Sequence, residues 1–255
     1  IRDRDKKTYF LSDLHLGASY LKNPRENERR IVRFLDSIKE DAKTIYLLGD
    51  ILDYWYEYKT VVPRGYTRFF GKIAELTDRG IEIHWFIGNH DIWIFDYLPS
   101  ELGVIVHDGT VITEIEGKTF FLSHGDNVGK RDWTFKLIRN IFRNKTCQKL
   151  YASIHPRWTI PFAHKWSSHS RKAGDPETTA YQGENNEYLV RFAKSYLKEH
   201  SINYFIFGHR HILLDLMLNR ESRIVILGDW INYFSYAVLE NGELIIDCFT
   251  QENAN

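Results

Sequence analysis

Apolar runs that end abruptly in polar residues are the main pattern along this chain. Each of five runs gives way to small or polar residues that include Asp, Asn or His, which a buried strand would not tolerate in its middle. The five endings are Asp13-Leu14-His15, Gly49-Asp50, Gly88-Asn89-His90-Asp91, Ser123-His124-Gly125-Asp126 and Gly208-His209-Arg210-His211. One kind of ending, repeated five times, predicts a shared site at the strand tips of one sheet.

The first half of the chain alternates between strand and helix patterns. Continuous apolar runs predict buried strands at residues 8–16, 44–48 and 81–87. Apolar residues at helical spacing predict helices at 25–39 and 67–79 between them. This order predicts an α/β fold with a parallel sheet and right-handed crossovers.

The pattern changes in the second half. Glu116-Gly117 predicts a tight hairpin between two strands, and Asn241-Gly242 predicts another near the end of the chain. The intervening region favours helices at 133–142 and 185–200, with short helices and loops at 156–176 between them. We expect further strands at 104–106, 111–115, 118–122, 204–207, 212–218, 223–227, 234–239 and 243–249.

The polar strand endings together predict a set of metal ligands. Ligands of open α/β sheets bind outside the carboxyl ends of the strands, so side chains from the five endings would converge there. The seven candidates are Asp13, His15, Asp50, Asn89, His124, His209 and His211. Mixed nitrogen and oxygen ligands suit Mn, Fe, Zn or Co, and seven ligands suit two ions that share a carboxylate.

We expect Asp50 to bridge the two ions with both of its carboxylate oxygens free. The first ion would then be held by Asp13, His15, His211 and Asp50, and the second by Asn89, His124, His209 and Asp50. In Gly208-His209-Arg210-His211, residues two apart in an extended turn face the same way, so each His can serve one ion.

A net charge of zero conceals one strongly basic stretch. Residues 130–172 contain eleven Lys or Arg and one acidic residue, so this stretch carries about +10 and the rest of the chain about −10. Seven aromatic residues lie in the same stretch. A solvated helical face would explain a few residues of each kind, whereas the whole set favours a surface for an anionic and partly apolar partner. We therefore expect a core of residues 1–127 and 201–255 and an inserted helical lid at 128–200.

The composition of the chain indicates the cellular compartment in which the protein is expected. Two cysteines, Cys147 and Cys248, provide no disulfide framework, which favours a reducing compartment. No apolar run approaches the ~20 residues that span a bilayer. The expected location is the cytoplasm.

Taken in order, the motifs resemble the calcineurin-like metallophosphoesterases. The motifs are Asp-x-His at Asp13, Gly-Asp-x-x-Asp at Gly49, Gly-Asn-His-Asp at Gly88, His-Gly-Asp at His124 and Gly-His-x-His at Gly208. The resemblance implies an αββα sandwich with a dinuclear site, commonly Mn, Fe or Zn, with manganese expected here. It also implies that His90 is a general acid or charge stabiliser, that Asp91 orients the His90 imidazole, and that Asp53 and Asp126 support the ligand loops.

Further features resemble one branch of that family, the UDP-2,3-diacylglucosamine pyrophosphatases of lipid A synthesis. They are Tyr54-Trp55 after Asp53, Leu227-Gly228-Asp229-Trp230, and the basic aromatic insert after Asp126. The resemblance implies a lipid-linked nucleotide sugar as substrate and peripheral association with the inner membrane through anionic lipid. Asp132 matches a substrate-contacting Asp of the branch, and Arg171 and Lys172 are expected phosphate contacts.

One residue departs from that branch. Its best-known members carry Arg where this chain has His90, which leaves open a paralogue that acts on another phosphoester. A nuclease of the same superfamily would also use basic and aromatic residues, but the neutral whole chain argues against a nucleic-acid partner. A scaffold without catalysis is the third alternative, and the intact ligand set argues against it.

Overall fold

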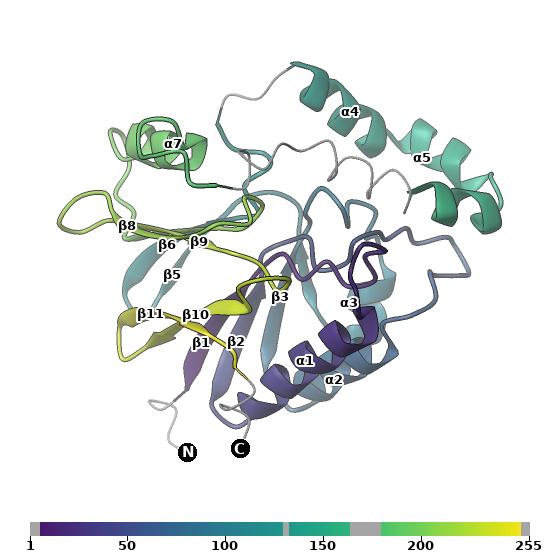
Figure 1. The fold of residues 1–255 in the computed structure, drawn as a ribbon, viewed down its shortest axis with the longest axis horizontal. Helices are drawn as coiled ribbons and strands as arrows, with labels where there is room; N and C mark the ends of the chain where they lie inside the picture. The colour runs from purple at the N-terminus through teal and green to yellow at the C-terminus, as the bar shows by residue number, and fades with distance from the viewer. Residues whose placement is uncertain (1–5, 130–132, 164–179, 251–255) are drawn as a thin grey trace.

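The computed structural model describes residues 6–129, 133–163 and 180–250. Its centre is a pair of mixed β-sheets packed face to face, with helices on both outer faces (Figure 1). This four-layer αββα arrangement is the one expected from the sequence.

The first sheet has the strand order β11-β10-β1-β2-β3-β4. Strands β1 to β4 run parallel, while β10 is antiparallel to β1 and β11 is antiparallel to β10. The strands are β1 (Lys7–Leu11), β2 (Ala42–Leu47), β3 (Glu82–Phe86), β4 (Ile105–His107), β10 (Ser235–Glu240) and β11 (Glu243–Cys248). The parallel half confirms the topology predicted from the alternating pattern.

The second sheet has the order β5-β6-β7-β9-β8. Its central strands β6, β7 and β9 are parallel, and antiparallel strands flank them at both edges. The strands are β5 (Val111–Ile115), β6 (Lys118–Ser123), β7 (Tyr204–Phe207), β8 (Leu213–Met217) and β9 (Arg223–Leu227).

Six helices complete the described elements. They are α1 (Pro24–Ser37), α2 (Thr67–Asp78), α3 (Tyr97–Leu102), α4 (Trp133–Arg143), α5 (Lys145–Ala152) and α7 (Tyr188–Tyr196), and residues 156–163 add a helical stretch. Helices α3 and α5 were not expected as separate elements. None of the helices in the described ranges has the length and apolar character needed to cross a bilayer.

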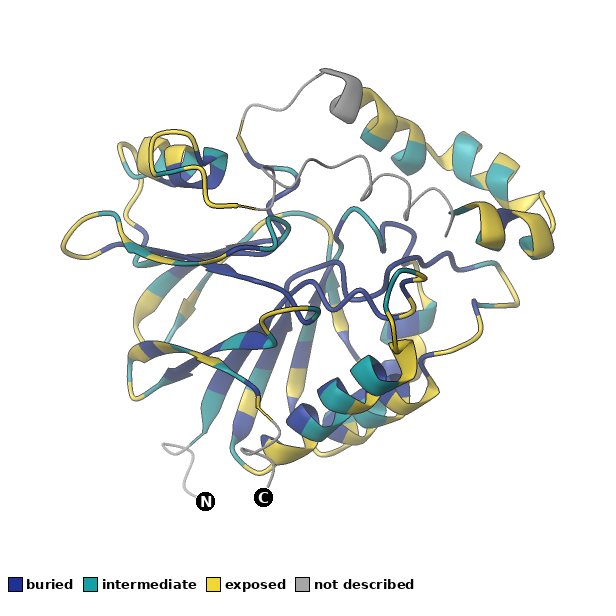
Figure 2. Cartoon of the chain, in the orientation of Figure 1, coloured by how far each residue is buried: buried dark blue, intermediate teal, exposed yellow. Residues whose placement is uncertain are grey.

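Strand β1 shows why the central strands are apolar throughout. Tyr9 and Leu11 pack against α1 and α2 on the outer face, whereas Phe10 packs between the two sheets. Successive side chains of a strand point to opposite faces, so a strand covered on both sides must be apolar at every position. Figure 2 shows the resulting buried centre, which continues into the loops at one edge of the sheets.

Helix α7 belongs to the core layers. Leu189, Val190 and Ala193 are fully buried in one apolar cluster with Phe205 and Ile224 of the second sheet. The sequence had placed this helix inside the insert at 128–200. The packing instead makes α7 the outer helical layer over the second sheet.

Candidate metal centre and adjoining cavity

The seven predicted ligands lie just beyond the carboxyl ends of five strands. Asp13 and His15 follow β1, Asp50 follows β2 and Asn89 follows β3, while His124 follows β6 and His209 and His211 follow β7. Both sheets therefore contribute, and their strand ends open toward the same edge of the molecule (Figure 1).

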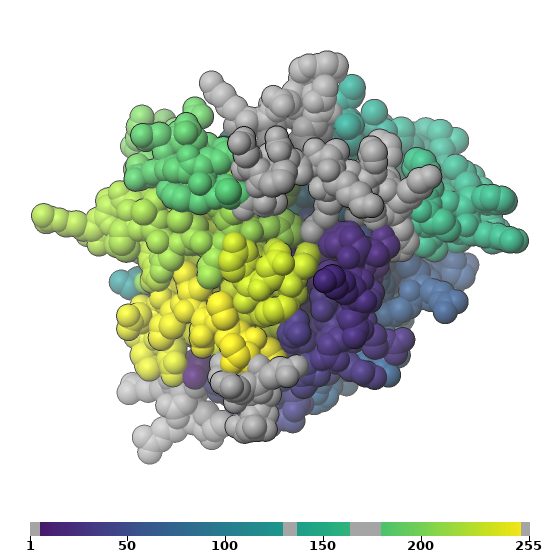
Figure 3. Space-filling model, viewed as in Figure 1, coloured from purple at the N-terminus to yellow at the C-terminus, as the bar shows by residue number. Residues whose placement is uncertain are grey.

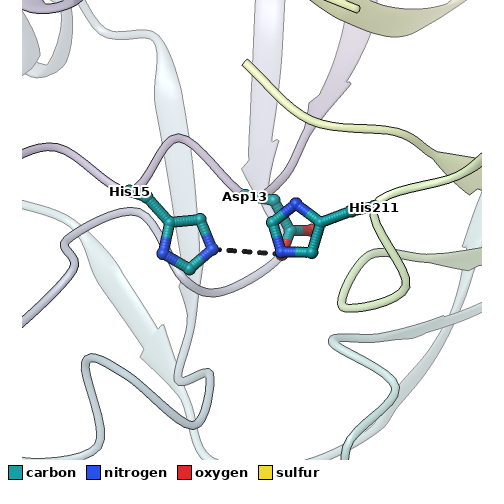
Figure 4. A group of neighbouring side chains, drawn as sticks. All are labelled: Asp13, His15 and His211. Carbon is teal, nitrogen blue, oxygen red and sulfur yellow. Dashed lines mark ion pairs between the residues drawn. The ribbon is translucent and has the colours of Figure 1, made fainter. Parts of the chain in front are cut away.

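Asp13, His15 and His211 form the first compact group (Figure 4). Asp13 Oδ1 lies 3.6 Å from His15 Nε2 and 3.4 Å from His211 Nε2. The other oxygen, Oδ2, accepts hydrogen bonds from Ser12 Oγ at 2.6 Å and from the backbone N–H of His209 at 2.8 Å. Oδ2 is thus fixed by the protein, while Oδ1 faces the two imidazoles.

Asp50, His124 and His209 form the second group. His124 Nε2 lies 3.3 Å from Asp50 Oδ2 and 3.3 Å from Asn89 Oδ1. The two groups thus contain the side chains that the sequence assigned to the two ions, with Asn89 beside the second.

Asp50 lies between the groups. Its Oδ2 is 3.6 Å from His15 Nε2 and 3.3 Å from His124 Nε2, so one oxygen faces both. Its Oδ1 accepts a hydrogen bond from the backbone N–H of His90 at 2.8 Å. The expectation that both oxygens are free was therefore wrong: Oδ1 accepts a hydrogen bond, and Oδ2 faces both groups.

The backbone around these residues is unusual. Nine non-glycine residues with positive φ occur in the described ranges, and five are predicted ligands: Asp13, His15, Asp50, His209 and His211. The left-handed region is unfavourable for such residues, and strain of this kind concentrates at functional sites. It also explains why β1 ends at Leu11 rather than extending to residue 16 as expected.

Gly208 allows the two sheets to approach each other at the site. A Cβ atom there would clash with Ser12 Oγ and would lie 2.5 Å from Asp13 Oδ2. Ser12 and Asp13 belong to the first sheet's loop, whereas Gly208 follows β7 of the second. The glycine therefore lets His209 reach Asp13 through its backbone N–H.

In three of the site histidines, Nδ1 lies close to a hydrogen-bond acceptor outside the cluster. His15 Nδ1 lies 3.3 Å from Asp53 Oδ1, His211 Nδ1 lies 3.1 Å from Asp229 Oδ2, and His124 Nδ1 lies 2.8 Å from the Leu48 carbonyl. An acceptor at Nδ1 fixes the ring orientation and directs Nε2 toward the site.

Asp229 was not assigned a role from the sequence. Its Oδ1 accepts hydrogen bonds from the backbone N–H groups of Ile231 and Asn232, so the carboxylate is fixed beside His211. A signal for it existed, because Gly228-Asp229 ends the apolar strand β9 as Gly49-Asp50 ends β2.

Asp91 does not orient His90, so that expectation was wrong. Asp91 Oδ1 accepts from the Gly88 N–H at 2.8 Å, and Oδ2 accepts from the Ile51 N–H at 3.0 Å and from Trp85 Nε1 at 3.3 Å. These bonds hold Asp91 inside the turn, where it ties the loop after β3 to the loop after β2.

Asp53 occupies the place beside His90 that Asp91 was expected to fill. His90 Nδ1 lies 3.1 Å from the Asp53 carbonyl oxygen and 3.5 Å from Asp53 Oδ1. The same carboxylate contacts His15, so Asp53 links the candidate acid to a candidate ligand. Asp53 supports a ligand loop, as expected.

The electrostatics reflect closely packed charges in a buried site. Burial alone would raise the pKa of Asp13, but the His211 charge and the His15 hydrogen bond hold it below its usual range. Burial would likewise raise the pKa of Asp50, yet His124 and His90 hold it well below 3.8. Burial would lower the pKa of His124, and the Asp50 carboxylate instead raises it to about 10. Both carboxylates are therefore ionised at neutral pH.

The donor set fits divalent cations. Asp13 Oδ1 is buried and has no hydrogen-bond partner among the residues that the structure describes, although two imidazole nitrogens face it. An unpaired buried carboxylate oxygen is costly unless a cation satisfies it. The mixed histidine, carboxylate and amide donors are those preferred by Mn, Fe and Zn.

A cavity of about 570 Å³ adjoins the site at Asn89 and His90. Ile92 and Trp93 line it from the core, and apolar residues of α4, including Ile138 and Ile141, line the facing wall. This volume is in the range of small-molecule sites. The cavity therefore lies between the candidate metal centre and the helices that stand above it.

An aromatic cluster attaches those helices to the core. Tyr54, Tyr56 and Trp93 from the core pack with Phe142 of α4 and Tyr151 of α5. Tyr54 Oη and Tyr151 Oη are 2.9 Å apart, and Tyr56 Oη donates to the Gln148 carbonyl. Figure 3 shows these helices, in teal, along the upper right side of the molecule.

Three expected substrate contacts cannot be placed at this site. Asp132, Arg171 and Lys172 lie outside the described residues. Asp126, expected to support a ligand loop, is buried and forms an ion pair with Arg139 of α4.

The comparison with protein families agrees with the motifs and the layers. The model of the calcineurin-like phosphoesterase family matches residues 6–213, which include all seven strand-end residues. The chain belongs to this family. Within it, the chain is 46% identical to a UDP-2,3-diacylglucosamine hydrolase of Porphyromonas gingivalis, over 94% of this chain and 97% of the relative.

The chain is also similar to other proteins at lower identity. A UDP-2,3-diacylglucosamine hydrolase of Neisseria meningitidis is 28% identical over 93% of this chain and 95% of the relative. Among solved structures, the phosphoesterase Yfce from E. coli aligns with a TM-score of 0.46 and 15% identity, over 95% of this chain and 92% of that one.

Proposed function

We propose that this phosphoesterase hydrolyses the diphosphate of UDP-2,3-diacylglucosamine to UMP and 2,3-diacylglucosamine 1-phosphate. The observation that carries the proposal is the apolar cavity that begins at Asn89 and His90, beside the cluster of candidate ligands. A phosphoester with an apolar chain fits this combination. The names of the relatives with full-length similarity support the choice of substrate.

The proposed cofactors are two divalent ions, with manganese expected and iron or zinc as alternatives. Asp13, His15 and His211 would hold one ion and Asn89, His124 and His209 the other, with Asp50 Oδ2 between them. Bound ions of this kind polarise the phosphoryl oxygens and bring the pKa of a coordinated water toward neutrality. The protein contributes the fixed imidazoles and carboxylates that set their spacing.

His90 is the proposed general acid. Its Nδ1 faces the Asp53 carbonyl and carboxylate, and its backbone N–H is bonded to Asp50. The ring is therefore held in the lining of the cavity, where it can donate a proton to the leaving oxygen or stabilise negative charge on the phosphoryl oxygens.

The helices above the cavity form the proposed lid. We draw it from α4 to residue 163 within the described residues, because α7 packs in the core. Each methylene that leaves water contributes ~0.8 kcal/mol, so a ~10-carbon chain supplies several kcal/mol in a lining such as Ile138, Ile141 and Phe142. The cavity thereby favours acylated over unacylated nucleotides.

The lid also carries the proposed membrane contact. Leu150 and Trp158 are 65% and 69% exposed and do not line the cavity, and Lys149 and Arg157 lie next to them. Each Lys or Arg near an anionic bilayer contributes ~1 kcal/mol, and exposed apolar side chains add insertion energy. We propose a cytoplasmic enzyme that rests peripherally on the inner membrane through this face.

A substrate panel tests the proposal. The protein is incubated with Mn and, separately, with UDP-2,3-diacylglucosamine, an unacylated UDP-sugar, a chromogenic phosphodiester and single-stranded DNA. Preferential UMP release from the acylated nucleotide is expected. Equal hydrolysis of both UDP-sugars would overturn the substrate, and preferential cleavage of DNA would favour a nuclease instead.

A further inference from the structure

One basic side chain lies in the otherwise apolar wall that α4 contributes to the cavity. Arg139 is the single Lys or Arg among the described residues that line it, and its neighbours in that wall are Ile138, Ile141 and Phe142. Placing a guanidinium among apolar side chains is unfavourable unless a partner uses its charge. An anionic partner in the cavity would therefore stabilise the Arg139 guanidinium.

Asp126, the partner of Arg139 in the protein, leaves hydrogen-bond donors of the guanidinium unused. Asp126 Oδ2 lies 3.4 Å from Arg139 Nε, beyond ordinary hydrogen-bond length, and Nε is buried without a hydrogen-bond partner in the described part of the chain. A guanidinium has five N–H donors in a planar fork that matches phosphate or carboxylate oxygens. Arg139 thus keeps donors that a second anion can accept.

Asp126 fixes where that second anion would lie. It is buried, lines the same cavity, and follows the candidate ligand His124 by two residues. Its ion pair therefore holds the guanidinium on the side of the cavity that borders the metal centre, with Asn89 and His90 in the same lining.

We propose that Arg139 binds the anionic group of the substrate where the metal centre meets the apolar cavity, and so selects phosphoesters joined to an apolar chain. This inference rests on the proposed function. Asp126 holds the guanidinium in place, and the incoming phosphate accepts the unused N–H donors. Arg139 is then a substrate-binding residue, and Asp126 is its positioning residue.

A purely structural role is the competing explanation. In that case the Arg139–Asp126 pair only fastens α4 to the core, as Arg143 of the same helix is fastened to Asp108. The two arginines lie one helical turn apart and each pairs with one aspartate, but only Arg139 lines the cavity. Arg143→Gln is therefore the matched control for Arg139→Gln.

The test measures inhibition by decylphosphonate, an alkyl chain with an anionic head, while the Mn-loaded protein hydrolyses a chromogenic phosphodiester. Arg139→Gln should raise the inhibition constant about tenfold to a hundredfold, the value of a lost charge-assisted hydrogen bond. Arg139→Lys should give an intermediate increase, since it keeps the charge and loses the fork. Arg143→Gln should change the constant less than about threefold.

Asp126→Asn distinguishes anion binding by Arg139 from an ion pair that only attaches α4 to the core. If Arg139 binds the anion, this variant should raise the inhibition constant clearly less than Arg139→Gln does, because the guanidinium loses its positioning partner but remains in the cavity. If the pair only fastens the helix, Asp126→Asn and Arg139→Gln should weaken inhibition equally, which would overturn the proposal. A wild type that decylphosphonate does not inhibit would overturn it as well. Neither readout depends on hydrolysis of the acylated nucleotide, so the proposed substrate can fail separately.

Discussion

Replacing Trp93 by Ala should detach the lid without disturbing the chemistry. The Trp93 ring packs on Tyr56 of the core at 5.3 Å, and on Phe142 and Tyr151 of the lid at 5.1 Å each. Its Nε1 donates a 2.8 Å hydrogen bond to the Phe142 carbonyl of α4. One side chain therefore carries contacts to both lid helices.

The free energy lost from lid docking follows from how the contacts of Trp93 are divided between the lid and the core. Removing a buried Trp side chain costs ~3–5 kcal/mol in all. About half of the ring contacts of Trp93 face the lid, so we assign ~2 kcal/mol to lid docking, or a ~30-fold shift toward the undocked state. The remaining loss should appear as lower global stability.

Hydrogen exchange and kinetics together measure this effect. Amides of α4 and α5 should exchange ~30-fold faster in the variant, while those of β1 and β7 keep most of their protection. The kcat/KM for UDP-2,3-diacylglucosamine should fall by up to the same factor, in proportion to the docked fraction that is lost. The kcat/KM for a small chromogenic phosphodiester should change little, because the metal centre is intact.

Phe205→Ala provides the matched control. Phe205 is fully buried beneath α7, so its loss should lower global stability comparably and leave the lid amides unchanged. If the two variants accelerate exchange in α4 and α5 equally, or if Trp93→Ala slows both substrates alike, the assignment of Trp93 to lid docking is refuted.

Three further outcomes are expected at the metal centre. Asp229→Asn should weaken metal affinity ~10–100-fold by loosening the His211 ring, and unchanged affinity in a chelator competition would exclude this role. The Asp50 carboxylate raises the pKa of His124 to about 10 in the metal-free protein, so metal binding must displace a proton from His124. Metal affinity should therefore rise about tenfold per pH unit from pH 7 to 9. An affinity that calorimetry finds constant over this range would contradict this. His90→Ala should slow turnover ~10²–10⁴-fold and retain both ions, since the variant keeps the backbone N–H that donates to Asp50 Oδ1. Loss of metal by elemental analysis would show that His90 acts in the ligand set.

The strand endings could be predicted from the sequence because their pattern has a local cause. A buried parallel strand must be apolar, so a sudden His or Asp marks the point where the chain leaves the sheet. The extent of the first strand could not be read in this way. Residues after Leu11 remain buried, as in Leu14 and Leu16, but Asp13 and His15 have a left-handed backbone that a strand cannot follow.

Residue roles within the turns depended on packing between loops. Asp91 and Asp53 are both motif aspartates, and sequence distance favoured Asp91 as the partner of His90. The folded loops turn Asp91 inward to backbone N–H groups and bring Asp53 from another loop to His90. The position of helix α7 could not be predicted for the same reason, because its apolar face fits packing within a lid as well as packing on a sheet.

The most direct test of the account is a metal titration. Metal-depleted protein is titrated with Mn while UMP release from UDP-2,3-diacylglucosamine is recorded. The strand-end cluster, with Asp50 Oδ2 facing both groups, predicts that activity saturates at two ions per chain and that Asp50→Ala binds neither ion tightly. Saturation at one ion, or full activity without metal, would contradict the account.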